Sequence, residues 1–498
     1  MSLAVVYSRA NLGIHAPLVE VEVHLSPGLP KMTIVGLPET VVKESKDRVR
    51  SAIVNSQFEF PTKRITINLA PADLPKEGGR YDLPIALGIL AASQQISTGN
   101  LAHYEFGGEL TLSGELRAFS GVLPMIIAAR DSNRGIILPE NFPCIPVQVQ
   151  GAKIFTAPDL LAVCQHLIEY RSLTPYIFSA ALEKEQNVLD LQDVCGQYQA
   201  KRALEIAAAG GHSLLMKGPP GSGKTMLANR LMTILPTISE SESLEVASLY
   251  SVAAPHGDER HYLLRPFRSP HHSASHAALV GGGRFPKPGE VSLAHHGVLF
   301  LDELPEFNRA SLEALREPLE AGMVTISRAA YSMQYPARFQ LIAAMNPCPC
   351  GYWQEGDSRC TCTIDQVKRY QQRLSGPLLD RIDLFVTTSP VEPGILVQEK
   401  PQQRTSSQEV RARVLEARQK QLARAEKLNA MLANAELTEV CRLNKEGQAF
   451  IHKAMQQFHV SARSYHRILK VARTIADLDH QDHIQLCHLQ EAWTLKQA

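Results

Sequence analysis

The chain is 498 residues long, and at about 150 residues per domain this length predicts roughly three domains. Its composition, 44% hydrophobic and 20% charged residues, is typical of a soluble globular protein and excludes the disordered, collagen-like and disulfide-scaffold classes. The 51 Lys and Arg residues balance 50 Asp and Glu residues, so the net charge favours neither a nucleic-acid coat protein nor a membrane-surface protein. A polyanionic partner would have to be met by a local patch of cations.

The nine cysteines are unevenly placed, with four of them between positions 348 and 362. The odd number and the cluster indicate reduced thiols and a metal site rather than a disulfide framework. Charged and polar residues interrupt the apolar residues of segment 1–24, so this segment lacks the apolar run of a secretory signal. No run of 18 apolar residues predicts a transmembrane helix. We therefore expect a cytoplasmic protein without a membrane partner.

The order of strand-like and helix-like patterns divides the chain into four segments. The first mixes strand-like runs such as 32–35 with an apolar helix at 83–92, as in an α+β domain. Farther along, the strand-like runs 214–216, 298–301 and 341–344 alternate with helices, which predicts a parallel sheet with crossover helices. The predicted segments are an α+β domain at 1–165, a linker at 166–189, an α/β domain at 190–395 and a helical domain at 396–498.

The strongest motif is a glycine-rich loop between a strand-like run, 212–216, and a helical stretch, 226–235. Its eight residues match G-x-x-x-x-G-K-[ST]: Gly218, Pro219, Pro220, Gly221, Ser222, Gly223, Lys224 and Thr225. Glycines let backbone N–H groups turn toward phosphates, the lysine reaches the β and γ oxygens, and the threonine offers a hydroxyl to Mg²⁺ at a helix N-terminus. This segment predicts a P-loop that binds ATP and Mg²⁺.

Polar side chains follow later strand-like runs of the same predicted domain. One run ends in Asp302 and Glu303. In P-loop enzymes a strand-end Asp holds Mg²⁺ and a following Glu can polarise the attacking water. Another run ends in Asn346, a residue suited to contact the γ-phosphate or to orient water. Arg381 then lies between two carboxylates, which fits either an internal ion pair or an arginine finger supplied to a neighbour's phosphates.

The order of P-loop, strand-end Asp-Glu, strand-end Asn and late Arg resembles that of an AAA+ ATPase. The residues of segments 265–273, 288–295 and 375–384 resemble the ComM/YifB family of magnesium-chelatase-like bacterial proteins. The resemblance covers nearly the whole chain. It implies an α/β fold in which an AAA+ P-loop core with a parallel sheet and a helical lid follows an α+β domain similar to the C-terminal domain of Lon proteases.

The resemblance also implies roles for single residues. Arg381 takes the role of the arginine finger of helix-2-insert AAA+ proteins. Arg463 takes that of the sensor-2 arginine of the lid, with Arg467 as a competing candidate. Gln197 belongs to a segment similar to the family's N-terminal nucleotide-pocket element, so we expect it near the adenine.

The Lon-like domain is expected to lack peptidase chemistry. In a Lon protease, the resemblance implies, segment 76–82 would carry the catalytic serine and segment 119–125 the lysine. Arg80 and Met125 occupy those places in this chain. Because a Ser/Lys dyad needs both a nucleophile and a base, the resemblance implies a folding unit without protease activity.

The cysteine cluster consists of two C-x-C pairs separated by nine residues: Cys348, Cys350, Cys360 and Cys362. Four thiolates from two short knuckles can complete a tetrahedral, structural Zn²⁺ site. The spacing is not the usual C-x-x-C, so reduced thiols in a surface loop are the alternative. A metal in this place would brace the loop between Asn346 and Arg381.

One candidate DNA-binding segment lies between the P-loop and Asp302. It is rich in cations and histidines, among them Arg268, His271 and His272. By resemblance it is the helix-2 insert of ring helicases, which points into the central pore. Cations suit contacts with phosphates. The alternative is that the histidines only brace a loop.

A second candidate is segment 326–335, which the pattern predicts as two strands with a tip. By resemblance it is the pre-sensor-1 hairpin of ring helicases. Arg328 suits a phosphate contact, and Tyr331 or Tyr335 suits stacking on a base. The Arg- and Lys-rich segment 411–427 is interpreted instead as a solvated helix face.

Together these features predict an ATP-hydrolysing ring motor on single-stranded or branched DNA, assembled as a homo-hexamer because Arg381 has to reach a neighbouring nucleotide. The resemblance implies branch migration of recombination intermediates during integration of transformed DNA. Two other classes stay open: a magnesium-chelatase-like motor subunit that remodels a protein partner, and an ATP-dependent chaperone or scaffold.

Overall fold

The chain is described by a computed structural model in two compact units. The first consists of residues 1–182, 239–264 and 327–335, and the second of residues 183–238, 265–326 and 336–498. The residues that the structure describes are 3–36, 40–142, 149–177, 189–253, 264–283, 286–327, 332–353, 359–390, 405–458 and 461–497. No helix within these ranges is long and apolar enough to span a membrane.

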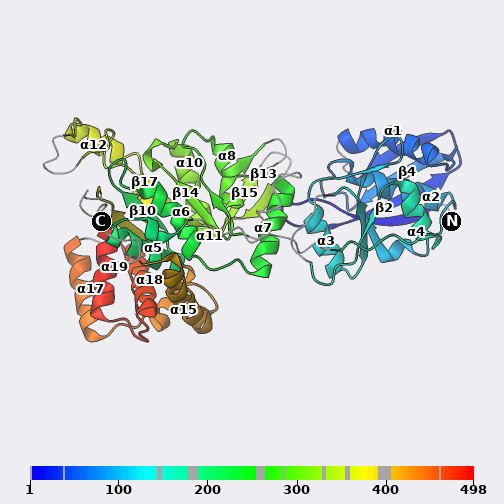
Figure 1. Cartoon of the computed structure of the whole chain (residues 1–498). Helices are drawn as coiled ribbons and strands as arrows, with labels where there is room; N and C mark the ends of the chain where they lie inside the picture. Colours follow the sequence, from blue (N-terminus) through cyan, green and yellow to red (C-terminus); the bar gives the residue numbers. More distant parts are fainter. Residues whose placement is uncertain are drawn as a thin grey trace. The chain divides into compact units, whose positions relative to one another are not determined.

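The first unit contains a mixed seven-stranded sheet in the order β3-β4-β2-β1-β5-β8-β9. Alternate residues of β2 are buried, including Val21 and Val23, so one face of the sheet is apolar. That face packs on α2 (Asp82–Ala92), which is buried along its whole length (Figure 1). The strands are β1 (Leu3–Arg9), β2 (Leu18–Ser26), β3 (Lys31–Val35), β4 (Arg64–Ala70), β5 (Tyr104–Phe106), β8 (Gly135–Pro139) and β9 (Ile154–Ala157).

Two segments from the predicted ATPase part of the sequence belong to this first unit. Helix α7 (Glu240–Ala253) packs on α3 (Val122–Asp131), where the N–H of Gly121 donates to the carbonyl oxygen of Ser251 at 3.0 Å. A Cβ atom at Gly13 would lie 2.8 Å from the carbonyl oxygen of Gln334. The first unit therefore combines residues 1–182 with segments that the sequence pattern assigned to the α/β domain.

The second unit is built on a parallel five-stranded sheet in the order β11-β14-β17-β10-β18. This confirms the α/β class with a parallel sheet, and Figure 1 shows α5 and α6 beside its strands. Because all five strands run the same way, their carboxyl ends meet at one edge. The elements are β11 (Phe267–Arg268), β14 (Val298–Leu301), β17 (Gln340–Met345), β10 (Leu214–Lys217), β18 (Leu384–Thr387), α5 (Tyr198–Gly210) and α6 (Lys224–Ile234).

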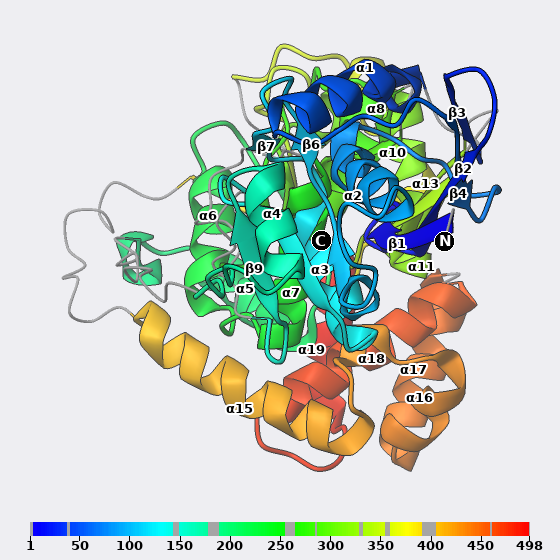
Figure 2. The same cartoon turned by 90° about the vertical axis from the view of Figure 1, so that its right-hand side faces the viewer.

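A helical region completes the second unit and appears in orange and red in Figure 2. Its first helix uses its cations inside the fold: Arg413 pairs with Glu205 at 2.6 Å, and Arg418 donates to the carbonyl oxygen of Ala208 at 2.9 Å. The basic segment is thus only partly the solvated face that the sequence predicted. The helices are α15 (Ser407–Ala425), α16 (Asn434–Val440), α17 (Lys445–Phe458), α18 (Ala462–Leu478) and α19 (Leu486–Gln497).

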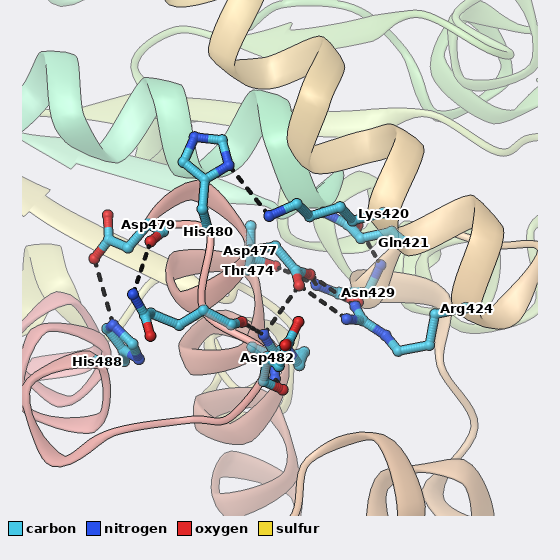
Figure 3. Close-up of polar contacts among 12 residues, drawn as sticks. Lys420, Gln421, Arg424, Asn429, Thr474, Asp477, Asp479, His480, Asp482 and His488 are labelled. Atoms are coloured by element: carbon cyan, nitrogen blue, oxygen red, sulfur yellow. Dashed lines mark hydrogen bonds and ion pairs between the residues drawn. The ribbon is translucent and has the colours of Figure 1, made fainter.

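A buried carboxylate, Asp477, joins α15 to α18 (Figure 3). Arg424 of α15 donates to both of its oxygens, at 2.7 and 2.8 Å, and Arg473 lies 3.0 Å away. The side-chain amide of Asn429 donates at 2.9 Å. Three side chains therefore donate to one carboxylate, which is 1% exposed, and this contact attaches α15 to α18.

We expect Asp477→Asn to destabilise the second unit by about 3 to 5 kcal/mol, because it leaves two guanidinium groups without their charge partner. Both tryptophans of the chain, Trp353 and Trp493, lie in this unit, so tryptophan fluorescence during urea unfolding reports on it alone. The matched control is Asp482→Asn. Arg473 donates to the backbone carbonyl oxygen of Asp482, so this substitution leaves that bond in place. Equal unfolding midpoints for the two variants would contradict the assigned role of Asp477.

Candidate nucleotide site and basic cleft

The predicted P-loop lies at the carboxyl edge of the sheet, between the interior strand β10 and helix α6. Gly221 and Gly223 have φ values of +76° and +86°, a region that side chains with a Cβ rarely adopt. The ammonium group of Lys224 donates to the carbonyl oxygens of Gly218 and Pro219 at 2.8 and 2.9 Å. Both glycines thus have backbone conformations that fit the predicted phosphate-binding loop.

The strand-end residues predicted from the sequence converge on this lysine. Asn346, which follows β17, accepts a hydrogen bond from Lys224 at 3.2 Å through its Oδ1 atom. Burial lowers the pKa of Lys224, while the charges of Asp302 and Glu303 raise it and partly oppose that effect. Parallel pairing of β10, β17 and β14 brings the three strand ends together.

A pair of oxygen ligands suited to Mg²⁺ lies beside the P-loop. The hydroxyl group of Thr225 donates to Oδ2 of Asp302 at 2.7 Å. The backbone N–H of Glu303 donates to the other oxygen of Asp302 at 2.9 Å, and Glu303 itself has a left-handed backbone with φ of +51°. A hydroxyl and a carboxylate at hydrogen-bond distance fit the two protein ligands that Mg²⁺ takes in P-loop enzymes.

Gln197 also contacts the P-loop. Its side-chain amide donates to the carbonyl oxygen of Ser222 at 3.0 Å and to that of Ser389 at 2.6 Å. Gln197, the residue directly before α5, therefore connects the P-loop to the segment after β18.

Arg381 lies at the opposite edge of the same sheet. It precedes β18, as Ser213 precedes β10, and these two strands are paired in parallel. The N–H of Ser213 donates to Asp383 at 3.1 Å, and its hydroxyl donates to the carbonyl oxygen of Arg381 at 3.1 Å. A four-residue strand of about 13 Å therefore separates Arg381 from the P-loop of its own chain.

Both sensor-2 candidates lie beside Arg381, in a cleft of about 920 Å³. Nη2 of Arg381 is 2.6 Å from Oε1 of Glu320, and Nη2 of Arg463 is 2.9 Å from the same oxygen. Partial burial opposes ionisation of Glu320, but the hydrogen bond from Arg381 and the neighbouring positive charges lower its pKa overall. The charged residues that line the cleft are Arg338, Arg381, Lys427, Arg463, Arg467, Lys470, Glu320 and Asp383.

Arg463 and Arg467 differ in how the fold uses them. Arg467 pairs with Asp383 and donates to the carbonyl oxygen of Arg381 at 2.6 Å. Burial would raise the pKa of Asp383, but the charges of Arg467 and His212 hold it well below its usual range. The side chain of Arg463 is 49% exposed, against 18% for Arg467. Arg467 is therefore the more enclosed of the two, and Arg463 is the more accessible.

The four clustered cysteines, which follow Asn346 in the chain, lie close together. Their sulfur atoms all lie within 4.8 Å of one another. The Sγ atom of Cys348 is 3.3 Å from that of Cys350 and 3.9 Å from that of Cys360, and the latter two are 3.6 Å apart. A tetrahedral site with Zn–S bonds of about 2.3 Å has S–S edges of about 3.8 Å, so the donor set fits Zn²⁺.

The predicted DNA contacts are only partly within the described residues. Arg328 and Tyr331 lie outside them, between β15 (Met323–Ser327) and β16 (Ser332–Pro336). Tyr335 is 1% exposed, so it is not open to stacking on a base. Both strands predicted for segment 326–335 are present, as β15 and β16.

In the other insert, Arg268 forms a two-pronged ion pair with Glu290, at 2.6 and 2.7 Å. His271 is exposed, and its ring lies 4.1 Å from that of His272, measured between centroids. Nδ1 of His272 is 3.1 Å from Oε2 of Glu303. The segment therefore contacts the predicted hydrolytic site directly.

The two segments that resemble the Lon dyad regions also meet in the first unit. Nη2 of Arg80 donates to the carbonyl oxygen of Ser120 at 2.8 Å, and its guanidinium group lies 5.1 Å above the ring of Phe119. Met125 is fully buried. The two positions are filled by a buried guanidinium group and a thioether. Neither side chain supplies the nucleophile or the base of a Ser/Lys dyad.

Glu320 and Glu290 were not predicted as site residues. Glu320 belongs to no motif, and Glu290 lies in the family-like segment 288–295, which gave no sign of its partner. Glu320 precedes Arg381 by 61 positions, and only the packing of α11 (Arg316–Ala321) against the cleft brings them together. Glu290 begins α9 (Glu290–Leu293), and the tertiary fold turns it toward Arg268. The link from His272 to Glu303 had no signal in the sequence either, although both residues were singled out.

Three family models match the chain. "Magnesium chelatase, subunit ChlI" matches residues 190–396, "Subunit ChlI of Mg-chelatase" matches residues 21–141, and "Magnesium chelatase, subunit ChlI C-terminal" matches residues 404–496. In the structure, the first match covers the region with the P-loop, the second the N-terminal part of the chain, and the third the helical region.

Curated relatives match along almost the full length. Competence protein ComM of Haemophilus influenzae is 52% identical over 496 residues, covering 99% of this chain and 97% of the relative. YifB of Escherichia coli is 51% identical, covering 99% and 96%. The magnesium-chelatase 67 kDa subunit of Heliobacterium mobile is 28% identical over 192 residues, covering 32% of this chain and 28% of the relative.

Proposed function

Because this chain belongs to the ComM/YifB family of magnesium-chelatase-like AAA+ ATPases, we propose that it is an ATP-driven ring motor that moves branched DNA. The observation that carries the proposal is the separation of two half-sites on one sheet. Lys224, Asp302 and Glu303 lie at the carboxyl edge, and Arg381 and Arg463 lie in the cleft at the opposite edge. Each half-site is complete only when it faces a second subunit.

The carboxyl edge supplies the groups for hydrolysis. Backbone N–H groups of the P-loop and Lys224 hold the β- and γ-phosphates. Thr225 and Asp302 would hold Mg²⁺, which would neutralise part of the phosphate charge. Glu303 accepts a proton from the water that attacks the γ-phosphorus, as the bond to the β-phosphate oxygen breaks and ADP leaves. Asn346, held by Lys224, orients that water or the γ-phosphate.

The cleft supplies the neighbour's share of the site. It holds six cationic side chains and two carboxylates, so its field attracts an anion of the charge of a triphosphate. Arg381 and Arg463 fit the finger and sensor-2 roles because they share one exposed carboxylate partner that a phosphate can replace. Head-to-tail contacts of this kind close into a ring, for which we propose a homo-hexamer.

Mixing two inactive variants tests action across subunits. Lys224→Ala lacks a working P-loop and Arg381→Ala lacks the finger, so each alone should lose ATPase activity by about 10³-fold or more. In a random mixture about a quarter of the interfaces combine an intact P-loop with an intact Arg381, and ATPase activity should return in that proportion.

The matched control is Lys224→Ala mixed with the double variant Lys224→Ala/Arg381→Ala, which contains no intact P-loop and should stay inactive. Absence of recovery in the first mixture, with both variants still assembling by analytical ultracentrifugation, would place Arg381 outside the neighbour's site.

We propose DNA as the substrate because one of the full-length relatives is named a competence protein and because the described insert carries donors at the hydrolytic site. His271 and His272 remain proposed phosphate contacts, with Arg328 and Tyr331 proposed for the tip between β15 and β16. Arg268 is the weakest of the proposed contacts, since Glu290 already engages it. Branch migration during integration of incoming DNA is the task that this kinship supports.

ATPase assays with and without single-stranded and four-way-junction DNA, run beside strand exchange from a labelled junction, test this function. We expect DNA to stimulate ATPase activity by about tenfold or more, as for motors that couple turnover to a bound strand. Glu303→Gln is the control, because it should bind ATP and release no labelled strand. Unchanged ATPase rates and no strand movement would favour a protein-remodelling motor, the alternative supported by the ChlI family models.

We further propose that Cys348, Cys350, Cys360 and Cys362 hold a structural zinc ion that braces the loop after Asn346. Hydrogen bonds from the backbone near Tyr352 and from Cys348 lower the pKa of Cys350. A bound divalent ion would then favour ionisation of the others.

Metal analysis of protein purified without a histidine tag should give about one zinc per chain. Cys360→Ser should lower this content and reduce ATPase activity, because the loop carrying Asn346 loses its brace. The control is Cys487→Ser, an exposed cysteine outside the cluster. Protein that is fully active with much less than one zinc per chain would rule the site out.

A further inference from the structure

Two arginines of the basic cleft share a single carboxylate oxygen. Nη2 of Arg381 lies 2.6 Å from Oε1 of Glu320, and Nη2 of Arg463 lies 2.9 Å from the same atom. We propose that Glu320 is a positioning residue, a latch that holds both guanidinium groups until the triphosphate of a neighbouring subunit replaces it. The inference rests on the proposed function, and it names the residue through which the β15–β16 hairpin acts on the neighbour's nucleotide.

The bond between Arg381 and Glu320 uses only half of a guanidinium fork. Nη1 of Arg381 donates to the carbonyl oxygen of Pro377 at 2.6 Å, and Nε, although buried, has no acceptor among the residues that the structure describes. In the ion pair of Arg268 with Glu290, by contrast, Nε and Nη2 both donate, at 2.6 and 2.7 Å. Arg381 therefore keeps one donor of its fork unused, and a phosphate group can accept from both once the side chain is released.

Glu320 is also the carboxylate that an entering anion has to displace. The other carboxylate of the cleft, Asp383, is 8% exposed and pairs with Arg467. The side chain of Glu320 is 43% exposed. The cations that line the cleft with it include Lys427 and Lys470, so the field favours an anion of higher charge than one carboxylate.

The position of Glu320 in the chain ties the latch to the root of the β15–β16 hairpin. Helix α11 ends one residue before Gly322, and β15 starts one residue after it. The N–H of Ala337 donates to the carbonyl oxygen of Gly322 at 2.8 Å, which closes the root, and both residues line the same cleft as Glu320. A Cβ atom at Gly322 would lie 2.9 Å from the side chain of Arg338, so the root is tightly packed. A shift of the root therefore moves Glu320 relative to the two arginines.

This arrangement directs the effect of the hairpin to the next subunit. Arg381 and Arg463 are proposed to serve the neighbour's nucleotide, so their release from Glu320 would change hydrolysis there rather than at the P-loop of the same chain. DNA held by the hairpin would shift its root, and the latch would open. Turnover would then pass from one subunit to the next around the ring.

Binding of inorganic triphosphate measures the latch directly. Lys224→Ala serves as the background, because it disables the P-loop as a competing site. In this background we expect Glu320→Gln to bind triphosphate about tenfold more tightly in calorimetric titrations, because the anion no longer has to displace a charged partner. Adding Arg463→Ala should remove most of the gain. The matched control is Glu317→Gln, which removes an exposed carboxylate of the same helix outside the cleft and should bind as the background does.

ATPase kinetics test the link to the hairpin. With an intact P-loop, Glu320→Gln should raise the DNA-free kcat/KM for ATP by about tenfold and reduce the stimulation by DNA to nearly onefold, because the arginines are already released. Glu320→Asp keeps the charge and should keep the low DNA-free value. Equal values for these two variants would show that the charge of Glu320 does not restrain the arginines.

The outcomes separate the latch from the proposed function. Unchanged or weaker triphosphate binding by Glu320→Gln, or an equal gain in Glu317→Gln, overturns the latch. A wild-type protein without DNA stimulation overturns the proposed DNA function, and a lack of recovery in mixtures of Lys224→Ala with Arg381→Ala overturns action across subunits. In either of these cases, tighter triphosphate binding by Glu320→Gln would still support the restraint on the two arginines.

Discussion

The parallel direction of the five strands in the second unit is the constraint on which the other features depend. All carboxyl ends meet at one edge, so the P-loop, Asp302, Glu303 and Asn346 are assembled there from strands far apart in sequence. The same polarity sends the residues before β18 to the other edge. In the proposed function, an arginine at that edge would serve the nucleotide of a neighbouring subunit, and one subunit alone would present two half-sites.

Charge is distributed in keeping with this division. Many cations of the second unit are used within the fold, as in the contact of Arg413 with Glu205 and the clasp of Arg424 on Asp477. The cleft around Arg381 keeps an excess of cations, and Glu320 is the exposed carboxylate among them. The overall charge of +1 thus coexists with a strongly positive cleft, which suits the interface proposed above.

Segments inserted into the ATPase sequence have two different destinations. The loop that carries His272 returns to the hydrolytic edge of its own sheet, whereas α7 and the segment ending at Tyr335 are packed within the first unit. Tyr335, an aromatic residue that suited stacking by composition, is buried by this packing. The sequence pattern alone does not distinguish these outcomes, because the surfaces on which an insert packs come from residues that lie hundreds of positions away in the chain.

The sequence by itself determined the parts whose chemistry is local. A P-loop needs its glycines and lysine at fixed spacing, a buried parallel strand needs a continuous apolar run, and both were legible in segments 214–225 and 298–303. The C-x-C pairs likewise indicated a sulfur cluster, and the structure brings the four sulfur atoms together.

Only the tertiary structure decided which side chains restrain these parts. The carboxylate of Glu320 holds Arg381 and Arg463, Glu290 engages Arg268, and His272 reaches Glu303. These partners are separated by tens to more than a hundred positions and follow no periodicity. Their contacts arise from strand order and helix packing, and the free energy of such a contact depends on burial and geometry that a sequence pattern does not contain.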